Sequence, residues 1–485
     1  MKPQLLTLKL LPLAFAIALA GCANDHGLKP DATVAQPGSL NATRSLAAVT
    51  VSPAAWPSET WWSSLGDQQL NALIDEALRD SPDLQVAAAR AHQATAAANA
   101  ADADRSAYIG ADANVSRSRL AKVQDPLLEG DRYSTLRSAE VTFDYTFDLW
   151  GGERAAWEAA LGQARAAEVD RQAARLTLAV DVARAYSDLG HAYIAADLAQ
   201  EDLSRTRRML ELGRQRLAAG IDSQYQLQQT ESLEASAQEQ AINADKELRS
   251  ARIALAILLG KGPDRASEIA RPQVLKPAAV ALPSQLPADL LGRRPDLIAA
   301  RWRVEAASRN VEVSKTRFYP NLNLTAAAGT QSLLGDALFG SASRFFNIAP
   351  AVSLPLFDGG RLRAGLDASD ADYELAVAQY NKALVGALGD VADAINRLEA
   401  LGRQVDAKQH AADVARQSFD TATQRYGSGI GNYLDVLTIE QQLLGAQQQL
   451  AALNAQRIDV SIQLMQALGG GYQGDTLASA QAPRD

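Results

Sequence analysis

The chain repeats itself, and this internal duplication is the strongest constraint on its fold. Four short motifs of the first half return in the same order about 210 residues later. One such match could arise by chance, whereas four in order at a nearly constant spacing indicate a duplicated structural unit. The 485 residues therefore predict one duplicated fold rather than several unrelated domains. The matching pairs are 81–84 with 294–297, 147–152 with 357–360, 216–221 with 425–430, and 259–260 with 468–469.

Two long stretches without proline predict the main helices of this unit. Residues 127–262 and 356–482 contain no proline and are rich in Ala, Leu, Gln, Glu and Arg, which have high helix propensity. Apolar residues recur every seven positions over 437–465, which predicts coiled-coil pairing of neighbouring helices. A glycine interrupts each stretch and predicts a turn into a returning helix. The expected helices are 151–217, which turns near Gly220, and 360–426, which turns near Gly429.

Four short segments alternate between apolar and other residues, which is the periodicity of a β-strand. Each has about the 9 to 11 residues that a tilted strand needs to cross a bilayer. A half-buried sheet in a water-soluble domain is the alternative. The expected strands are ~108–119 and ~138–148 in the first half, and ~320–331 and ~344–356 in the second.

Four strands are too few to close a sheet on itself. An open edge in lipid leaves unpaired backbone groups that cost several kcal/mol each, so a chain that crosses a membrane in this way must oligomerise. Two copies would give eight strands, whose interior is filled by side chains, whereas three copies would give twelve strands and a lumen. A duct built from this chain therefore needs three or more copies.

The N-terminus has the layout of a secretory signal that ends at a lipid-attachment site. Lys2 and Lys9 precede an apolar run over 10–20 that is too short for a membrane span. The sequence LAGC at 19–22 resembles the bacterial lipobox, which implies cleavage before Cys22, lipid on that residue and sorting to the outer membrane. An ordinary secreted protein with a chance cysteine is the alternative. The expected segments are a signal peptide, 1–21, and a lipidated tether, 22–63.

Charge and hydropathy argue against two further classes of protein, those that bind nucleic acid and those with a helical membrane span. The formal net charge is −9, and removal of residues 1–21 leaves 45 basic against 56 acidic residues, a charge of −11. This acidity argues against nucleic acid as a partner. After Cys22 no run of about 18 apolar residues occurs, so we expect no helical membrane span. The expected repeats are 64–270 and 288–471, joined by a proline-rich linker, 271–287, and followed by a tail, 472–485.

From about Trp61 to Tyr472 the chain resembles the TolC-type outer membrane factors, specifically the lipidated branch that serves resistance-nodulation-division (RND) efflux pumps. The resemblance implies an α+β fold in which duplicated coiled-coil helices form a periplasmic α-barrel. It also implies a homotrimer whose four strands per chain close a twelve-stranded barrel in the outer membrane. A periplasmic adaptor and an inner-membrane RND pump are the implied partners of a passive exit duct for small molecules such as drugs. The motifs concerned are the lipobox, 293–296, 318–320, 354–360, 425–429 and 467–471.

The same resemblance implies a gate at the two hairpin turns. Residues 433–438 look like the family's gate segment. Asp435 matches one of the two acidic positions of that segment, and Thr438 stands at the second. An arginine–aspartate latch of some members is replaced by Gly431 and Gln226, so we expect no salt-bridged latch. The expected gate contacts are packing and neutral hydrogen bonds from Tyr225, Gln226 and Tyr426, and the expected adaptor-docking tip is Gly220, Ile221, Gly429 and Ile430.

No pattern in the sequence points to catalysis, a metal or a cofactor other than lipid on Cys22. The four histidines lack metal-ligand spacing, and no nucleophile is paired with one of them. Residues 427–431 mimic a phosphate-binding loop, but no strand precedes them, so a helix end and a turn are expected. We therefore expect no enzyme. The alternatives to a drug duct are an outer-membrane lipoprotein scaffold and an exit duct for a secreted peptide or a metal ion. The sequence has only three methionines and no methionine-rich stretch, which disfavours a metal ion as cargo.

Overall fold

The computed structural model describes residues 32–35, 56–119, 121, 133–277, 292–333 and 338–473. The expected signal peptide, Cys22 and most of the expected tether lie outside these residues, as do parts of the expected linker and tail. Within the described part of the chain, no helix combines the length and apolar character needed to cross a membrane.

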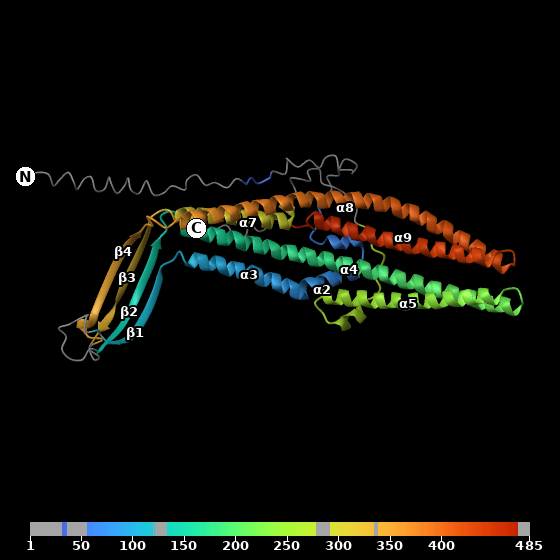
Figure 1. The fold of residues 1–485 in the computed structure, drawn as a ribbon, viewed down its shortest axis with the longest axis horizontal. Helices are drawn as coiled ribbons and strands as arrows, with labels where there is room; N and C mark the ends of the chain where they lie inside the picture. The colour runs from blue at the N-terminus through green and yellow to red at the C-terminus, as the bar shows by residue number, and fades with distance from the viewer. Residues whose placement is uncertain are drawn as a thin grey trace, which may run out of the picture. The chain divides into compact units, whose positions relative to one another are not determined.

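The described residues form long helices, shorter helices and four strands (Figure 1). The long helices are α4 (Gly152–Ala218), α5 (Gln224–Leu258), α8 (Arg361–Gly427) and α9 (Tyr433–Ala467). The shorter helices are η2 (Trp61–Leu65), α2 (Gln68–Asp80), α3 (Pro82–Ala103), η3 (Pro263–Glu268), α7 (Pro295–Thr316) and η5 (Ser341–Ser343). The strands are β1 (Tyr108–Arg119), β2 (Tyr133–Phe147), β3 (Asn321–Ser332) and β4 (Arg344–Ser353).

The long helices reflect the duplication in their lengths. Helices α4 and α8 have 67 residues each, and the returning helices α5 and α9 have 35 residues each. Both long helices start one position after the expected start. Figure 1 shows α4 turning back into α5 and α8 into α9. The glycines expected at the turns, Gly220 and Gly429, lie between the members of each hairpin.

The residues fall into two compact units that differ from the two sequence repeats. Unit 1 comprises residues 1–34, 90–167 and 300–380, and unit 2 comprises 35–89, 168–299 and 381–485. Each unit takes residues from both halves of the sequence. The duplicated halves are therefore interleaved in the fold, and the helices α3, α4, α7 and α8 each contribute to both units.

Unit 1 contains an antiparallel sheet with the strand order β1-β2-β3-β4. Strand β1 covers the expected range, whereas β2 begins at Tyr133, before the expected start near 138. Strand β4 ends at Ser353 rather than near 356. Its last residue, Ser353, pairs with Asn321, the first residue of β3, so β4 ends where its partner strand begins.

The register of the sheet separates apolar from polar side chains. Ile109 pairs with Phe143, Ala326 with Ile348, and Leu322 with Val352, and these alternate positions share one face. The opposite face carries pairs such as Asp112 with Glu140. The apolar face is open in the single chain, since Phe346 is 83% exposed and Ile348 is 66% exposed.

The start of α4 is held against the start of β3 by an aromatic contact. The rings of Trp150 and Tyr319 stack with centroids 4.7 Å apart, and the indole Nε1 of Trp150 donates to the carbonyl oxygen of Pro320 at 2.8 Å. Before α4, the carboxylate of Asp148 accepts from the backbone N–H of Arg154 at 2.9 Å and so caps the helix. These contacts fix the transition from sheet to helix.

The core of unit 2 lies where α2 packs against the long helices. Leu70 of α2, Tyr186 of α4, Leu255 of α5 and Leu464 of α9 are all completely or almost completely buried in one cluster. Each such side chain stabilises the fold by roughly 1.5–3 kcal/mol.

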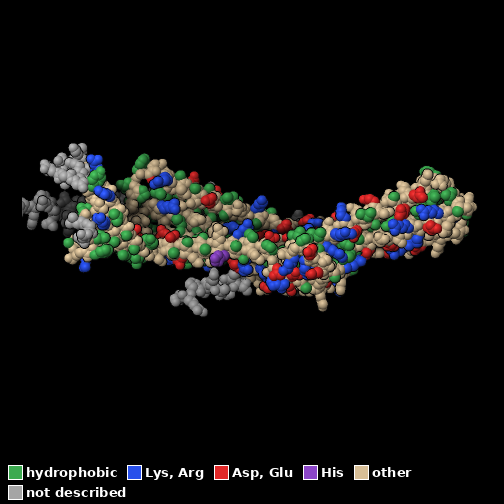
Figure 2. All heavy atoms as spheres, turned by 90° about the horizontal axis from the view of Figure 1, so that it is seen from below, with side chains coloured by type: hydrophobic (Ala, Val, Ile, Leu, Met, Phe, Trp, Pro, Cys, Tyr) green, Lys and Arg blue, Asp and Glu red, His purple; other side chains and the backbone are tan. Residues whose placement is uncertain are grey.

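The helix surfaces in view carry Lys and Arg interspersed with Asp and Glu, as Figure 2 shows.

The glycine run at the end of α9 is explained by a close backbone approach. Gly471 has a φ of 81°, and a Cβ atom there would lie 2.2 Å from the carbonyl carbon of Ser58. No other residue fits this position without moving the backbone. The motif at 467–471 therefore packs the C-terminal end of α9 against the segment that precedes η2.

Candidate functional site

The two hairpin turns of unit 2 are built alike. Gly220 and Gly429 have φ values of 72° and 79°, the left-handed conformation that ends a helix. The N–H of Ile221 donates to the carbonyl of Arg216 at 2.9 Å, and the N–H of Ile430 donates to the carbonyl of Arg425 at 3.0 Å. No neighbouring atom would obstruct a side chain at either glycine, so conformation rather than space requires glycine there.

Side chains cap the helices that leave these turns. Ser223 and Gln226 form a reciprocal capping box at the start of α5, with the Ser223 N–H donating to Oε1 of Gln226 at 2.7 Å. Asn432 caps α9 by accepting from the N–H of Leu434 at 3.2 Å. Hydrogen bonds within each turn thus satisfy its backbone groups. Side chains that do not take part in capping are left to make contacts beyond the turn.

A three-residue cluster joins the two hairpins at their turns. Arg216 of α4 donates from Nε and Nη2 to the carboxylate of Asp222 at 3.0 and 3.2 Å. The hydroxyl of Tyr426, on α8, donates to Oδ2 of the same carboxylate at 3.0 Å. The guanidinium carbon of Arg216 also lies 4.4 Å from the centre of the Tyr426 ring, within range of a cation–π interaction. Asp222 is therefore shared between an ion pair within one hairpin and a hydrogen bond to the other.

A second contact between the hairpins lies beside this cluster. The hydroxyl of Tyr433, at the start of α9, is hydrogen-bonded to the hydroxyl of Thr230 on α5. The rings of Tyr426 and Tyr433 are 5.7 Å apart, and both residues pack with Met209 and Val436 in a small apolar cluster. Tyr433 is only 4% exposed, so its hydroxyl depends on Thr230 for a partner.

Burial and the neighbouring carboxylate keep these tyrosines neutral. Burial, reinforced by the hydrogen bond to Asp222, raises the pKa of Tyr426 from 10.0 to about 12. Burial also raises the pKa of Tyr433, while its hydrogen bond with Thr230 acts in the opposite direction. Both phenols therefore stay protonated to a higher pH than an exposed tyrosine would.

A buried ion cluster lies further along the same helices. Arg205 of α4 is in ion-pair contact with Glu440 of α9 at 3.3 Å and with Asp202 and Glu201 of its own helix at 3.6 and 3.3 Å. Burial raises the pKa of Glu440 against the opposing effect of Arg205, and burial also raises the pKa of Asp202. Nε of Arg205 and Oε1 of Glu440 have no aligned hydrogen bond within the described part of the chain, which leaves this pair incompletely satisfied.

The residues expected to form the gate occupy two kinds of position. Tyr426 is buried between the hairpins, whereas Asp435 and Thr438 lie on the exposed side of α9. The hydroxyl of Thr438 donates to the carbonyl of Leu434 in its own helix at 2.8 Å. Tyr225 is exposed, and its hydroxyl accepts from Gln229 at 3.0 Å, while Gln226 serves the capping box. The residues expected at the docking tip, Gly220, Ile221, Gly429 and Ile430, are all exposed.

Within one chain, Tyr426 bonds to a charged group, whereas neutral hydrogen bonds were expected at the gate. Its partner is the carboxylate of Asp222, which is also paired with Arg216. Tyr225 and Gln226 bond within α5 and its cap rather than to the other hairpin. No sequence pattern pointed to Arg216, Asp222, Thr230 or the pair of Arg205 with Glu440 as contacts, and Tyr433 entered only as part of the gate segment 433–438. A charged residue directly after the Gly220 turn, six positions from an arginine, was the available signal.

Gly431 is held against the backbone of the preceding helix. A Cβ atom at Gly431 would lie 2.8 Å from the backbone nitrogen of Tyr426. A larger residue would therefore push the turn away from the helix that carries Tyr426. The expectation of a helix end and turn at 427–431 agrees with the observed end of α8 and start of α9.

An antiparallel sheet with one apolar face, together with paired long hairpins that meet at their turns, defines a channel of the TolC type. The chain belongs to the outer membrane efflux protein family, whose sequence profile matches residues 73–261 and 286–470. It is therefore an outer membrane protein that takes part in efflux, and it is not an enzyme.

Related sequences carry names that refer to resistance. The chain is 36% identical to the fusaric acid resistance protein FusA of Burkholderia cepacia over 373 residues, 75% of this chain and 69% of that protein. It is 30% identical to the multidrug resistance outer membrane protein MdtP of Escherichia coli K12 over 434 residues, 88% of this chain and 89% of that protein.

Solved structures share the fold. The outer membrane protein VceC of Vibrio cholerae matches with a TM-score of 0.80 and 36% identity, over 86% of this chain and 100% of VceC. The CmeC outer membrane channel of Campylobacter jejuni matches with a TM-score of 0.84 over 93% of this chain and 96% of CmeC. At 22% identity, the CmeC comparison concerns the fold alone.

Proposed function

We propose that three copies of this chain form the outer-membrane exit duct of a tripartite efflux system. The observation that carries this proposal is the register of the sheet, which collects the apolar side chains on one open face. Such a face suits contact with lipid, and the polar face suits a water-filled interior. Strands β1 and β4 are the edges of the sheet, so neighbouring copies would pair edge to edge. Three copies would supply twelve strands and leave a lumen.

The hairpin turns would form the periplasmic end of the duct. Asp435 is exposed on α9 and has no ion-pair partner in the described part of the chain. Three copies of Asp435 around an axis would form an acidic ring that attracts cations, with Thr438 one helical turn away. The exposed Ile221 and Ile430 would offer an apolar tip to a periplasmic adaptor protein, and an inner-membrane RND pump would supply the energy for transport.

The cargo we propose is small molecules such as drugs. Relatives at 30% identity or more are named for multidrug resistance and for fusaric acid resistance, which supports small organic molecules over peptides or metal ions. Lipid on Cys22 would anchor each copy to the membrane. The lipid prediction rests on the sequence LAGC at 19–22.

Native mass spectrometry in mild detergent tests the assembly and the anchor together. We expect a trimer whose subunit mass equals residues 22–485 plus the attached acyl groups, and a Cys22→Ser variant that lacks the added mass. Monomers or dimers alone would overturn the duct. A deletion strain with unchanged drug tolerance, despite intact trimers in the parent, would instead favour a lipoprotein scaffold.

A further inference from the structure

Unit 2 contains a groove whose lining includes none of the residues described at the hairpin turns. It has a volume of about 520 Å³ and runs between α4, α9 and the segment 271–277, with one residue from α8. Its apolar lining includes Ile194 and Leu198 of α4 and Leu450 and Ile458 of α9. The volume lies within the range of about 300–1,000 Å³ that is typical of sites for small organic molecules.

One wall of the groove is a segment that hydrogen bonds hold in place. The backbone N–H of Gln273 donates to Oδ2 of Asp67 at 3.0 Å, and the same oxygen accepts from the hydroxyl of Tyr186 at 2.7 Å. The amide of Gln69 exchanges two hydrogen bonds with the backbone of Ala270, at 3.0 and 3.1 Å. Asp67 is 4% exposed, so its bonds to Gln273 and Tyr186 are shielded from water. The groove is therefore preformed.

The charged side chains that line the groove are all cationic or potentially cationic. They are Arg271, Arg416, Arg457 and His191, and no aspartate or glutamate is among the lining residues. Arg271 is paired with Asp197 outside the groove. Arg416 and Arg457 have no ion-pair partner among the described residues, so their charges are available to a ligand.

A buried amide adds a polar contact inside the groove. Gln447 of α9 is 9% exposed, lines the groove, and has an Oε1 atom without a hydrogen-bond partner in the described part of the chain. A buried polar atom of this kind costs free energy unless a water or a ligand bonds to it. The groove thus combines an apolar lining, two free cations and an unused hydrogen-bonding group.

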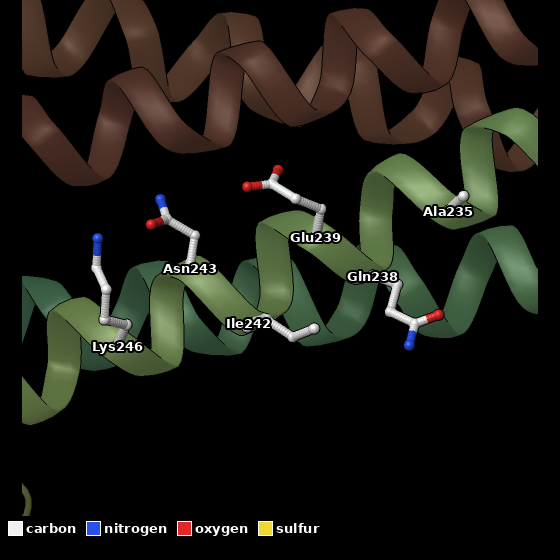
Figure 3. Close-up of a pocket in the computed structure, with 6 residues that line it drawn as sticks. All are labelled: Ala235, Gln238, Glu239, Ile242, Asn243 and Lys246. Carbon is white, nitrogen blue, oxygen red and sulfur yellow. The ribbon is translucent and has the colours of Figure 1, made fainter.

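A hollow on α5 differs from this groove in that its lining residues do not converge. It has a volume of about 450 Å³, but its six lining residues all come from one helix. Figure 3 shows Glu239, Asn243 and Lys246 pointing to one side of α5 and Gln238 and Ile242 pointing away from them. Lys246 is also paired with Glu247 at 2.8 Å. These side chains do not converge, so the hollow is a surface depression.

We propose that the groove between α4, α9 and residues 271–277 binds a small organic anion, an alkyl or aryl carboxylate with an apolar body. The carboxylate lies by Arg416 and Arg457, and the apolar body lies along Leu450 and Ile458. This site is an accessory one, separate from the hairpin turns where the gate is proposed. Its occupancy does not depend on the proposed duct.

Isothermal titration calorimetry of the full chain in maltoside micelles tests this site. The probe is 4-butylbenzoate, with the uncharged 4-butylbenzamide as its comparison and matched titrations into empty micelles as blanks. We expect wild type to bind the carboxylate more tightly than the amide. An Arg416→Gln/Arg457→Gln variant should weaken carboxylate binding by about tenfold or more, because two charge-assisted contacts are lost, and should leave the amide unchanged.

Two further variants separate a site from general charge or folding effects. Arg403→Gln/Lys408→Gln removes two positive charges of α8 outside the groove, one at an exposed and one at a half-buried position, and should bind as wild type does. Ala451→Trp fills the groove and should abolish binding of both compounds while the oligomeric state by native mass spectrometry stays that of wild type. Three outcomes would each overturn the proposal. They are equal affinity for carboxylate and amide, an equal loss of binding in the α8 control, and no binding to wild type because another copy covers the groove.

Discussion

The hydroxyl of Tyr426 donates a 3.0 Å hydrogen bond to the carboxylate of Asp222, which lies 204 residues earlier in the sequence. This bond joins the turn of one hairpin to the long helix of the other. Because Asp222 also holds Arg216, the position of the acceptor is set within its own hairpin. The link from Asp222 to the other hairpin therefore depends on the phenol of Tyr426.

Removal of that hydroxyl should loosen the hairpin turns. Tyr426→Phe keeps the ring in the apolar cluster but leaves Asp222 with Arg216 alone, and hydrogen bonds to charged groups contribute about 1.5–3 kcal/mol. We expect a lower melting temperature and a higher conductance in planar bilayers. The matched control is Tyr225→Phe, whose hydroxyl bonds only to Gln229 of its own helix. Equal behaviour of the two variants would contradict a role for the bond between hairpins.

The buried acid Glu440 should give the stability a measurable pH dependence. Burial raises its pKa above the ordinary 4.5, despite the opposing effects of Arg205 and Arg208, and the charge of Asp202 raises it further. A carboxyl with a higher pKa in the folded state adds stability that is complete below the unfolded value and is lost as the pH rises through the folded value. The melting temperature of wild type relative to Glu440→Gln should therefore fall as the pH rises above 4.5.

Circular dichroism across this pH range measures the effect of Glu440→Gln. Glu231→Gln, which removes an exposed carboxyl of α5 that lies 3.9 Å from Arg214, is the matched control. A difference between wild type and Glu440→Gln that stays flat or rises with pH would show that burial does not dominate at Glu440.

The close approach at Gly431 predicts a sharp difference between neighbouring glycines. Gly431→Ala places a Cβ atom 2.8 Å from the backbone nitrogen of Tyr426, whereas Gly427→Ala meets no atom within 4 Å. Overpacking of this kind costs roughly 1–3 kcal/mol. We expect Gly431→Ala to lower the melting temperature and Gly427→Ala to leave it equal or higher. If both variants melt alike, the turn is able to shift without cost.

The two faces of the sheet should respond in opposite ways to a new charge. Phe346→Lys puts a cation on the apolar face, where a lipid-facing lysine costs about 2–4 kcal/mol near the bilayer centre. Asn347→Lys puts the same charge on the polar face, one residue along β4. We expect the first variant to reduce the amount of trimer in outer-membrane fractions and the second to assemble normally. Reversed outcomes would mean that the apolar face does not meet lipid.

Much of the fold could be predicted because its signals are local and periodic. The strand at 108–119 follows from simple alternation, and the helices starting near 151 and 360 follow from long runs of helix formers. The end of β4 could not be placed as well, since the apolar alternation continues past Ser353 to Leu354 and Leu356, whereas the partner strand β3 begins at Asn321, opposite Ser353. Periodicity reports which face is apolar, but backbone pairing decides where a strand ends.

The contacts at the hairpin turns were harder to predict for a physical reason. The bond of Tyr426 to Asp222 and that of Tyr433 to Thr230 each join positions more than 200 residues apart, at |i−j| values of 204 and 203. Spacing within one helix does not reveal which side chain of the other hairpin lies opposite. The resemblance to the TolC-type family points to Gln226, whereas the acceptor of the Tyr426 hydrogen bond is Asp222, which follows the Gly220 turn.

The separation of the two faces of the sheet also affects how the protein is made. Strands β1 to β4 expose apolar side chains such as Ile348 and Phe346 in the isolated chain, and exposed apolar patches in water promote aggregation. A newly exported subunit must therefore cross an aqueous compartment before any partner covers this surface. Until lipid or other copies of the chain cover this surface, the subunit is open to aggregation, so assembly and insertion must outpace the association of exposed sheets.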